Sequence, residues 1–358
     1  MSEKIVALMS GGVDSSTAAA ILLQRGFQVI GITMKVWEDA GPTEEFTRRC
    51  CSAADADDAR RVCALLNIPH YVSNAKAAFR RYVVDPFCKE YLTGRTPNPC
   101  IVCNTDIKFR LMLRRAHSLG AAGVATGHYA RITRDSATER FLLLKGRDAT
   151  KDQSYFLYNL TQSQLAHISF PVGELTKTQV RAKAREFGLP TAQKPESQEI
   201  CFVPDGDYRK LLEKIAPDRL RPGPILDVTG RRLGEHMGIA NYTIGQRRGL
   251  GIAHPKPLYV VGFNVERNAV IVGTAEHVWA RELVAEDLNW ISVTGLRQPM
   301  RLTARIRYKH IESPALVSPL DRNSVLVRFD HPQRSITPGQ AVVFYDGDVV
   351  VGGGIIKK

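Results

Sequence analysis

A short glycine- and serine-rich turn between a strand and a helix constrains this chain more than any other feature. The turn and its flanks read Met9-Ser10-Gly11-Gly12-Val13-Asp14-Ser15-Ser16-Thr17. The apolar run at residues 5–8 predicts a buried parallel strand, and the alanine- and leucine-rich run at 18–23 predicts a helix. A second apolar run at 29–34 follows. The first thirty-odd residues therefore form one strand–turn–helix–strand unit.

The turn has the chemistry of a phosphate site. Gly11 and Gly12 let backbone N–H groups approach an anion, and the helix start adds its positive dipole end. The hydroxyls of Ser10 and Ser15 are further donors. No lysine follows the glycines as in G-x-x-x-x-G-K-[ST], and G-x-G-x-x-G is absent. Asp14 would repel a phosphate unless a cation lay between them, which indicates Mg²⁺. A plain turn with a Ser/Asp helix cap is the alternative.

Charge and composition indicate a polyanionic partner. Lys and Arg outnumber Asp and Glu 49 to 36 in 358 residues, a formal net charge of +13, although many basic proteins bind no nucleic acid. No apolar run approaches the roughly 20 residues that cross a bilayer, and the start of the chain lacks a signal-peptide pattern. We therefore expect a cytoplasmic protein with no membrane association. Seven cysteines fit a reducing compartment.

The order of patterns predicts the fold class, α/β: a doubly wound parallel-sheet nucleotide-binding domain, then a small central module and a C-terminal β-barrel. We expect helices at 53–66, 75–91 and 106–118, and strands at 69–72 and 121–126. Ligands in such sheets bind beyond the carboxyl ends of the strands. The expected domains are 1–203, 204–257 and 258–358, and the strand-like run at 259–263 is placed in the barrel.

Three cysteines are candidate reactive groups. Cys100 and Cys103 form a C-x-x-C pair in the stretch 95–104, whose prolines predict an extended, non-helical path. Two such thiols could share a metal, form a disulfide or relay sulfur. Cys201 follows about a hundred residues later in another expected loop. The remaining cysteines are interpreted as structural thiols: Cys50, Cys51, Cys63 and Cys88.

Other charged and polar residues are interpreted individually. Asp55, Asp57 and Asp58 stand at an expected helix start, where acids usually satisfy the helix dipole and solvent, so they are left outside the site. His128 follows the expected strand end at 125–127, where a nucleotide should lie. The run at 305–310 places alternating cations and one aromatic on a strand, which suits RNA phosphates and bases but also a solvated face.

Taken together, the motifs resemble one known family. The turn at 9–17 alone is similar to the signature of pyrophosphatase-loop enzymes, which adenylate a substrate with ATP. The whole chain resembles the bacterial tRNA-specific 2-thiouridylases, nearly end to end and in order. The matching segments are the turn, 95–99 with Cys103-Asn104 and 107–109, 125–129, 151–157, Ile200-Cys201-Phe202, 243–247, and 337–341 with 352–354.

The resemblance implies an enzyme, a tRNA-uridine 2-sulfurtransferase. It uses ATP to adenylate the C2 oxygen of the wobble uridine, and sulfur then displaces AMP. ATP is expected on Leu8, Met9, Ser10, Gly11, Gly12, Val13, Asp14 and Ser15, with Met34 and Gly127 near the adenosine. The positions matching tRNA contacts are His128, Lys151, Asp152, Gln153, Arg307, Tyr308 and Gln340. Asn98, Pro99 and Cys100 match positions beside the target base.

One departure from the family pattern bears on the sulfur source. The familiar members have Asp at the position of Cys100, and there the residue matching Cys103 is the nucleophile while that matching Cys201 carries a persulfide. With Cys100 present, three thiolates suit a [4Fe-4S] cluster with one open iron, which the Cys form of this family is associated with. The alternative is the persulfide relay without a cluster. The implied donor is a cysteine desulfurase relay or sulfide.

Two other functions compete with this one. A pyrophosphatase-loop amide-forming ligase fits the turn but leaves the cysteines and the net charge of +13 without a role. An RNA-binding protein with a degenerate nucleotide site is disfavoured by the intact Gly11, Gly12, Asp14 and Ser15. Release of pyrophosphate that is stimulated by tRNA would distinguish the tRNA sulfurtransferase from both of these functions.

Overall fold

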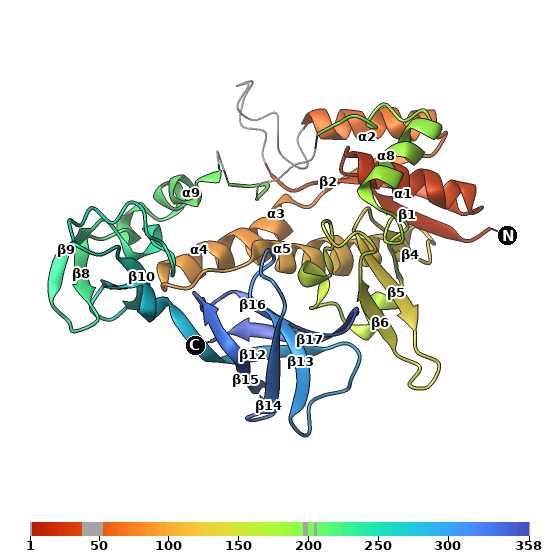
Figure 1. Ribbon diagram of the computed structural model, residues 1–358. Helices are drawn as coiled ribbons and strands as arrows, with labels where there is room; N and C mark the ends of the chain where they lie inside the picture. The colour runs from red at the N-terminus through yellow and green to blue at the C-terminus, as the bar shows by residue number, and fades with distance from the viewer. Residues whose placement is uncertain (1, 38–52, 196–199, 204–205, 358) are drawn as a thin grey trace. The chain divides into compact units, whose positions relative to one another are not determined.

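A computed structural model describes residues 2–37, 53–195, 200–203 and 206–357 (Figure 1). Cys50 and Cys51 lie outside the described residues. The chain divides into two compact units. The first unit comprises Met1–Val84, Pro99–Gly206 and Asp348–Val350, and the second comprises Asp85–Asn98, Asp207–Gly347 and Val351–Lys358.

A five-stranded parallel sheet forms the centre of the first unit. Its strands are β1 (Lys4–Leu8), β2 (Gln28–Lys35), β3 (His70–Asn74), β4 (Gly123–Ala125) and β7 (Ile168–Ser169), in the order β3-β2-β1-β4-β7. Every pairing is parallel. The strand order reverses between β1 and β4, and ligands bind such sheets at the carboxyl ends of the strands there. The glycine-rich turn follows β1, and residues 126–129 follow β4.

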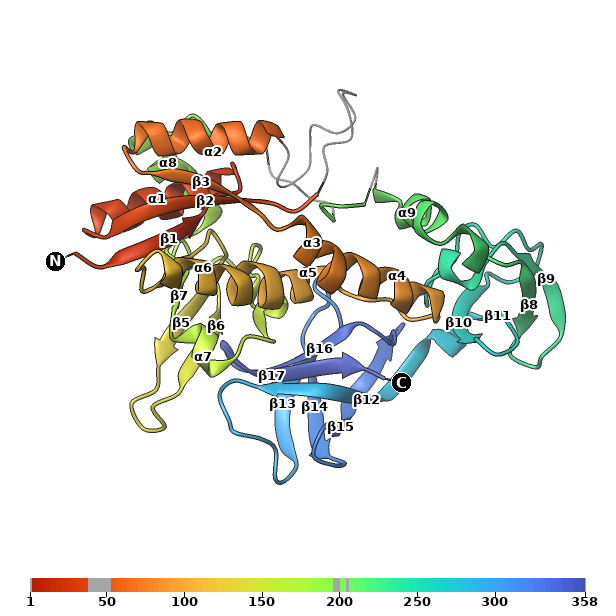
Figure 2. The same cartoon turned by 180° about the vertical axis from the view of Figure 1, so that it is seen from behind.

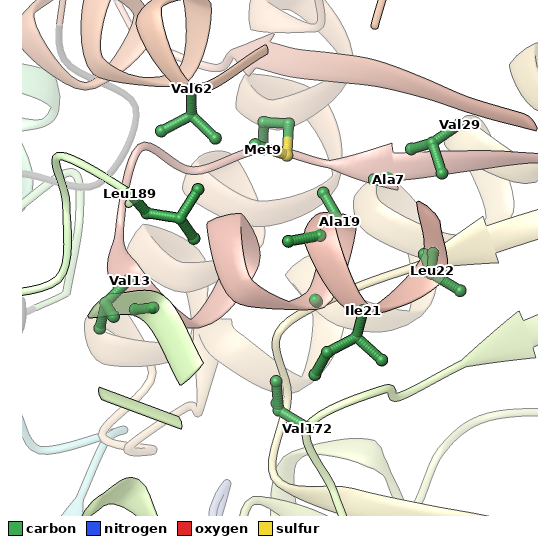
Figure 3. Close-up of a cluster of buried hydrophobic side chains, with 14 of the residues drawn as sticks. Ala7, Met9, Val13, Ala19, Ile21, Leu22, Val29, Val62, Val172 and Leu189 are labelled. Carbon is green, nitrogen blue, oxygen red and sulfur yellow. The ribbon is translucent and has the colours of Figure 1, made fainter. Parts of the chain in front are cut away.

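Helices lie on both faces of this sheet, which confirms the doubly wound prediction. One face carries α1 (Val13–Gln24), α2 (Ala53–Leu65) and α8 (Lys177–Glu186), and the other carries α6 (Met112–Ser118) (Figures 1 and 2). Figure 3 shows the apolar cluster between the first three helices and the sheet, with Met9, Ala19 and Val62 among its members. The alanines at 18–20 have small side chains, so α1 packs close to β1 and β2.

Two helical stretches differ from the sequence prediction. The expected helix at 75–91 is broken into α3 (Lys76–Phe79), the π-helix η2 (Arg80–Val84) and α4 (Asp85–Leu92). The stretch at 95–104, expected to be extended, is helical from Pro99: α5 (Pro99–Val102) leads into the π-helix η3 (Cys103–Leu111) and then α6. Pro99 is the first residue of α5, where its fixed φ favours a helix and its missing N–H costs nothing.

A hairpin and short helices complete the first unit. The antiparallel strands β5 (Ala130–Arg134) and β6 (Phe141–Lys145) follow β4 directly. The 3₁₀-helix η4 (Ser154–Leu157) and α7 (Gln162–Leu165) then lead to β7. Leu144 of β6 also pairs with Val349.

The second unit contains two β structures. A four-stranded sheet has the order β10-β11-β8-β9, with β8 (Gly223–Asp227), β9 (Arg232–His236), β10 (Tyr259–Asn264) and β11 (Ala269–Gly273). The run at 259–263, expected in the barrel, therefore belongs to this sheet, because β10 pairs with β11. The helix α9 (Tyr208–Ile215) and the 3₁₀-helices η6 (Pro217–Arg219), η7 (Ile239–Asn241) and η8 (Ala275–Val278) accompany it.

The predicted barrel is confirmed. Its strands are β12 (Trp279–Trp290), β13 (Met300–Arg305), β14 (Ser313–Pro319), β15 (Ser324–Arg334), β16 (Ala341–Asp346) and β17 (Val349–Ile356). They follow the order β12-β15-β14-β13-β16-β17, and the β12–β17 pairing closes the ring. Alternate side chains such as Leu302, Val327 and Phe344 fill the interior. Within the described residues, no helix is both long and apolar enough to cross a membrane.

Candidate nucleotide and sulfur site

The glycine-rich turn lies against the start of α2. Gly11 has φ +70°, and a Cβ at this position would lie 2.2 Å from the carbonyl oxygen of Asp55. Both the left-handed backbone and the close approach therefore require glycine. The turn is held where β1 ends and α1 begins.

The first turn of α1 is arranged for an anion. Its N-cap is Gly12, which has no side chain that could cap the first N–H groups. The alternative of a Ser/Asp cap is therefore not what the structure has. Ser15 Oγ donates to the Gly12 carbonyl at 3.1 Å and accepts from the Ser10 N–H at 3.2 Å, so the hydroxyls brace the turn. Uncapped N–H groups at a helix start are a phosphate-binding arrangement.

A lysine from a distant helix neutralises the acid of the turn. Lys177 Nζ of α8 lies 2.8 Å from both carboxylate oxygens of Asp14, and the Tyr129 hydroxyl donates to Asp14 Oδ1 at 2.7 Å. The Lys177 side chain is only 12% exposed. Sequence reasoning invoked Mg²⁺ to separate Asp14 from phosphate, whereas here an ammonium group holds that carboxylate. The Asp14 donor set thus fits a lysine, and it does not by itself require a metal.

A second lysine meets the other side of the turn. Lys194 Nζ donates to the Gly11 carbonyl at 3.1 Å, to Asp55 Oδ1 at 2.7 Å and to Asp58 Oδ2 at 2.6 Å. Burial disfavours its charge, but the hydrogen bonds and charges of Asp55 and Asp58 outweigh burial and raise the pKa of Lys194. Asp55 and Asp58, which the sequence analysis leaves outside the site, therefore hold a cation against the turn.

The strand end after β4 packs on the start of α1. A Cβ on Gly127 would lie 2.6 Å from the Asp14 carbonyl carbon and the Ser15 nitrogen. Gly127, expected near adenosine, is thus in contact with the turn. Met34, the other residue expected there, is buried at the end of β2, on the other side of β1 from β4.

His128 is an interior residue. Its Nδ1 lies 2.7 Å from Thr126 Oγ1, and its ring is near those of Phe109 and Phe170. Burial, with the nearby charge of Lys108, holds the pKa of His128 well below its usual range. The ring is therefore neutral at physiological pH, and its expected role in tRNA contact has to be reconciled with this burial.

Residues 151–153 include two side chains that hydrogen-bond to the backbone following β4. Asp152 is buried and accepts hydrogen bonds from the Gly146 and Ser154 N–H groups and from the Ser154 hydroxyl. Gln153 Oε1 accepts the Tyr129 N–H at 2.9 Å. These two residues, expected to contact tRNA, thus order the backbone that carries Tyr129, while Lys151 is half-buried.

The three candidate cysteines belong to the first unit. Cys100 lies on α5 and is exposed, Cys103 begins η3 and is half-buried, and Cys201 is half-buried. Across 2–37, 53–195, 200–203 and 206–357, no three His, Cys, Asp or Glu side chains form a group that could hold a metal ion. The expected three-thiolate cluster site is not assembled in this arrangement.

The cysteines interpreted as structural behave as such where the structure describes them. Cys63 and Cys88 are buried. Burial raises the pKa of Cys63 to about 12, so its thiol is protonated and unreactive at neutral pH.

The remaining expected tRNA contacts lie in the second unit. Gln340 Nε2 donates to the carbonyls of Thr96 and Pro97, at 2.8 and 3.3 Å, just before Asn98. Arg307 Nη1 donates to the Arg334 carbonyl at 3.1 Å, which orders the basic stretch that includes Tyr308. Pro99, the neighbour of Asn98 in the chain, is buried in the first unit.

Comparison with known proteins defines the class. Three family models match: a tRNA methyl transferase HUP domain at residues 3–205, a tRNA methyl transferase PRC-barrel domain at 209–274, and an aminomethyltransferase β-barrel domain at 280–356. Together with the parallel sheet and its phosphate-type turn, they define a nucleotide-binding enzyme domain followed by two β domains.

Full-length relatives narrow the class to one family. A protein named tRNA-specific 2-thiouridylase MnmA from Heliobacterium modesticaldum is 53% identical over 100% of this chain and 93% of its own length. One of the same name from Acetivibrio thermocellus is 54% identical over 99% of both chains. The chain belongs to the tRNA-specific 2-thiouridylase family of tRNA sulfurtransferases, as the motifs indicated.

The contact of Gly127 with the turn generates a first prediction. Gly127→Ala places a methyl group 2.6 Å from the backbone of Asp14 and Ser15, so the turn must shift. A displacement of this size at a binding site reduces kcat/KM by about a hundredfold. Gly262→Ala, where nothing lies within 4 Å of the new Cβ, is the matched control. Steady-state kinetics with ATP as the varied substrate measure kcat/KM, and equal values in the two variants would contradict the assignment.

The burial of His128 generates a pH prediction. Its folded pKa lies below the value near 6.5 of the unfolded chain, so at pH below about 6.5 the unfolded state binds the extra proton. The free energy of unfolding therefore falls as the pH drops from 7.5 to 5.5. Urea denaturation of wild type and His128→Gln at both values measures this. We expect a smaller drop in the variant, and equal drops would show that His128 is not held neutral.

Proposed function

We propose that this enzyme replaces the C2 oxygen of the wobble uridine in tRNA by sulfur, at the expense of ATP. The supporting observation is the phosphate-type turn, braced by Lys177 and Lys194, in the same unit as Cys100, Cys103 and Cys201. The names of the full-length relatives point to the same reaction. We assign ATP chemistry to residues 1–203, and tRNA contact also to the region of the four-stranded sheet β10-β11-β8-β9 and to the barrel β12–β17.

The first step is adenylation. A carbonyl-type oxygen is a poor leaving group until it becomes a phosphate ester. The uridine O2 attacks the α-phosphorus of ATP, its bond to phosphorus forms, and pyrophosphate leaves. The N–H groups of the α1 start bind the phosphates, and the ammonium groups of Lys177 and Lys194 offset the acids beside them. ATP enters as its magnesium complex, and no step is assigned to the metal.

The second step delivers sulfur. A persulfide on Cys201 attacks C2 through its outer sulfur, and AMP departs with the oxygen. The thiolate of Cys103 then attacks the inner sulfur of Cys201. A disulfide between the two cysteines forms, and the outer sulfur stays on C2 as the thiocarbonyl. A thiol reductant resets the disulfide, and a cysteine desulfurase relay then transfers a sulfane sulfur from its own persulfide to the Cys201 thiolate. Where sulfide is the donor, it attacks Cys201 Sγ of the disulfide directly, which forms the Cys201 persulfide and releases the Cys103 thiolate.

A [4Fe-4S] cluster on Cys100, Cys103 and Cys201 is the second candidate for the sulfur source. The departure at Cys100 favours it, because three thiolates are the usual ligands of a cluster with one open iron. The arrangement of the described residues argues against it, because these thiols do not form a metal-binding group. The relay through Cys103 and Cys201 is therefore the route we propose.

The partner in this proposal is tRNA. The net charge of +13 provides a field that attracts a polyanion. Arg307, Tyr308 and the residues around Asn98 would contact its backbone and anticodon loop. His128, Asp152 and Gln153, which are bonded inside the first unit, would act by shaping the surface rather than by direct contact. We expect the enzyme to work in the cytoplasm, where its substrate is found.

An amide-forming ligase remains the competing activity for this turn. It would adenylate a small carboxylate and would not need Cys103 or Cys201. A radiometric assay of pyrophosphate release from ATP separates the two, because only the tRNA sulfurtransferase is stimulated by tRNA that carries an unmodified wobble uridine.

The two-step scheme predicts that mutation of a cysteine abolishes sulfur transfer while adenylation continues. Cys103→Ser and Cys201→Ser should each lower 2-thiouridine formation by about a thousandfold or more, since the variants lack a sulfur-transfer group. Release of pyrophosphate should persist, because adenylation uses the turn and not the thiols. Cys88→Ala, at a buried thiol, is the control that should keep both activities. Loss of pyrophosphate release in the serine variants would contradict the scheme.

The sulfur source is tested at Cys100. Without a cluster, Cys100→Asp restores the residue of the familiar members, and it should keep most 2-thiouridine formation when a persulfide donor is supplied. Iron and acid-labile sulfide are measured on anaerobically purified wild type and variant. A near-stoichiometric cluster in wild type, lost together with activity in Cys100→Asp, would establish the cluster and overturn the relay.

A further inference from the structure

The motif at 243–247, which the proposed reaction does not use, leads into two adjacent arginines at 247 and 248. The Gly245 N–H donates to the Val260 carbonyl at 2.8 Å, and the Val260 N–H donates to the Gln246 carbonyl at 2.9 Å, so the motif is bonded to β10. Gln246 Nε2 also donates to the Arg248 carbonyl at 3.0 Å. The loop that carries both arginines is therefore ordered by its own hydrogen bonds.

The same motif touches the end of β15 in the barrel. A Cβ at Gly245 would lie 2.3 Å from Ser335 Oγ, so glycine permits this close approach. Ser335 has φ +56°, and its N–H donates to the Val278 carbonyl at 2.7 Å. Arg307 Nη1 donates to the Arg334 carbonyl at 3.1 Å. The motif and Arg307 thus contact two consecutive residues of the chain, Ser335 and Arg334.

Two aromatic side chains accompany Arg334. Its Cζ lies 5.4 Å from the centroid of the Tyr259 ring, which is a cation–π contact. Trp279 is the register partner of Arg334 in the β12–β15 pair, and directly opposite side chains of an antiparallel pair stand on the same face of the sheet. Trp279 is 52% exposed. An exposed indole ring and an exposed guanidinium therefore share one face of this strand pair.

The arginines of this region have no carboxylate partner. Arg247, Arg248 and Arg334 are exposed, and within the part of the chain that the structure describes none of them forms an ion pair. Elsewhere on the barrel, the exposed Arg301 pairs with Asp330 at 2.9 Å. The positive charge of the three arginines is thus not offset by neighbouring acids, and it is available to an anionic partner.

We propose that this region binds a stretch of RNA backbone and stacks one unpaired base. The region, named here the Trp279 surface, comprises Arg247, Arg248, Tyr259, Trp279 and Arg334. A guanidinium presents a fork of donors that matches a phosphate, and an indole ring stacks on the face of a base. The same side chains suit an acidic protein, but the net charge of +13 favours a long polyanion. The choice of tRNA as the RNA rests on the proposed function.

The first test is the salt dependence of tRNA binding. The anisotropy of fluorescently labelled, unmodified tRNA gives Kd over a series of KCl concentrations. Each phosphate contact that is lost lowers the slope of log Kd against log salt by about 0.7–0.9. We expect Arg334→Gln to show this decrease, and the double variant Arg247→Gln with Arg248→Gln to show about twice as much. Arg301→Gln removes an arginine already paired with Asp330 and should keep the wild-type slope.

The second test addresses the stacked base. Trp279→Ala removes the ring and should weaken tRNA binding by about tenfold. Its salt slope should match that of wild type, because no cation is lost. Trp279→Phe keeps an aromatic face and should retain most of the affinity. Leu320→Ala, at another exposed apolar residue of the barrel region, is the control and should bind tRNA as wild type does.

Kinetics separate this surface from the groups that react. The Trp279 surface belongs to the second unit, whereas the glycine-rich turn and the candidate cysteines belong to the first. Its variants should therefore raise KM for tRNA while kcat for 2-thiouridine formation stays within about twofold of wild type. A fall in kcat with an unchanged KM would contradict a role in binding.

The outcomes distinguish the two proposals. Equal tRNA affinity and equal salt slope in wild type, the arginine variants and Trp279→Ala would overturn the Trp279 surface, even with 2-thiouridine formation intact. A wild-type enzyme that binds tRNA through these residues but forms no 2-thiouridine would overturn the proposed function and support the surface.

Discussion

Charge neutralisation at the glycine-rich turn is the constraint on which the rest of the first unit depends. Three carboxylates, on Asp14, Asp55 and Asp58, surround the turn at which we propose that the phosphates of ATP bind. Lys177 and Lys194 each hold one side of it at 2.6–3.1 Å. Removing one partner of a partly buried pair destabilises the fold, because a partly desolvated charge is left without its partner. The ion pairs therefore set the position of α8 and of residues 191–194 relative to the strands.

The sequence predicted what depends on local pattern. The strand, turn and helix at the start of the chain follow from residue types within a few positions of one another, and so do the alternating strands of the barrel. The two lysines could not be found in this way. Lys177 lies 163 residues from Asp14, and Lys194 lies 183 residues from Gly11. The available signal was indirect: a glycine-rich turn with an acid and no lysine of its own requires a cation from elsewhere. The sequence pointed to Mg²⁺, and the structure shows that Lys177 also meets the Asp14 carboxylate.

The region of the C-x-x-C pair shows a different limit of sequence reasoning. The prolines at 97 and 99 predict a non-helical path, yet proline is excluded only from helix interiors. Pro99 begins α5, and the helix continues through Cys103 into the π-helix η3. A π-helix inserts an extra residue per turn and is found often at functional sites. It begins at Cys103, and no periodicity argument anticipates such a break in a regular helix.

Several residues that the resemblance assigns to tRNA contact are bonded to the interior of the first unit. The side-chain oxygens of Asp152 and Gln153 accept hydrogen bonds from the backbone N–H groups of residues 129, 146 and 154. His128 is neutral and lies among aromatic rings. A buried polar group of this kind is costly to disturb, so it fixes one conformation of its surroundings. This order also positions Tyr129, whose hydroxyl donates a hydrogen bond to Asp14 beside the glycine-rich turn. Resemblance to a family therefore nominates these positions, while the contacts of His128, Asp152 and Gln153 show that their side chains order the surrounding backbone and rings.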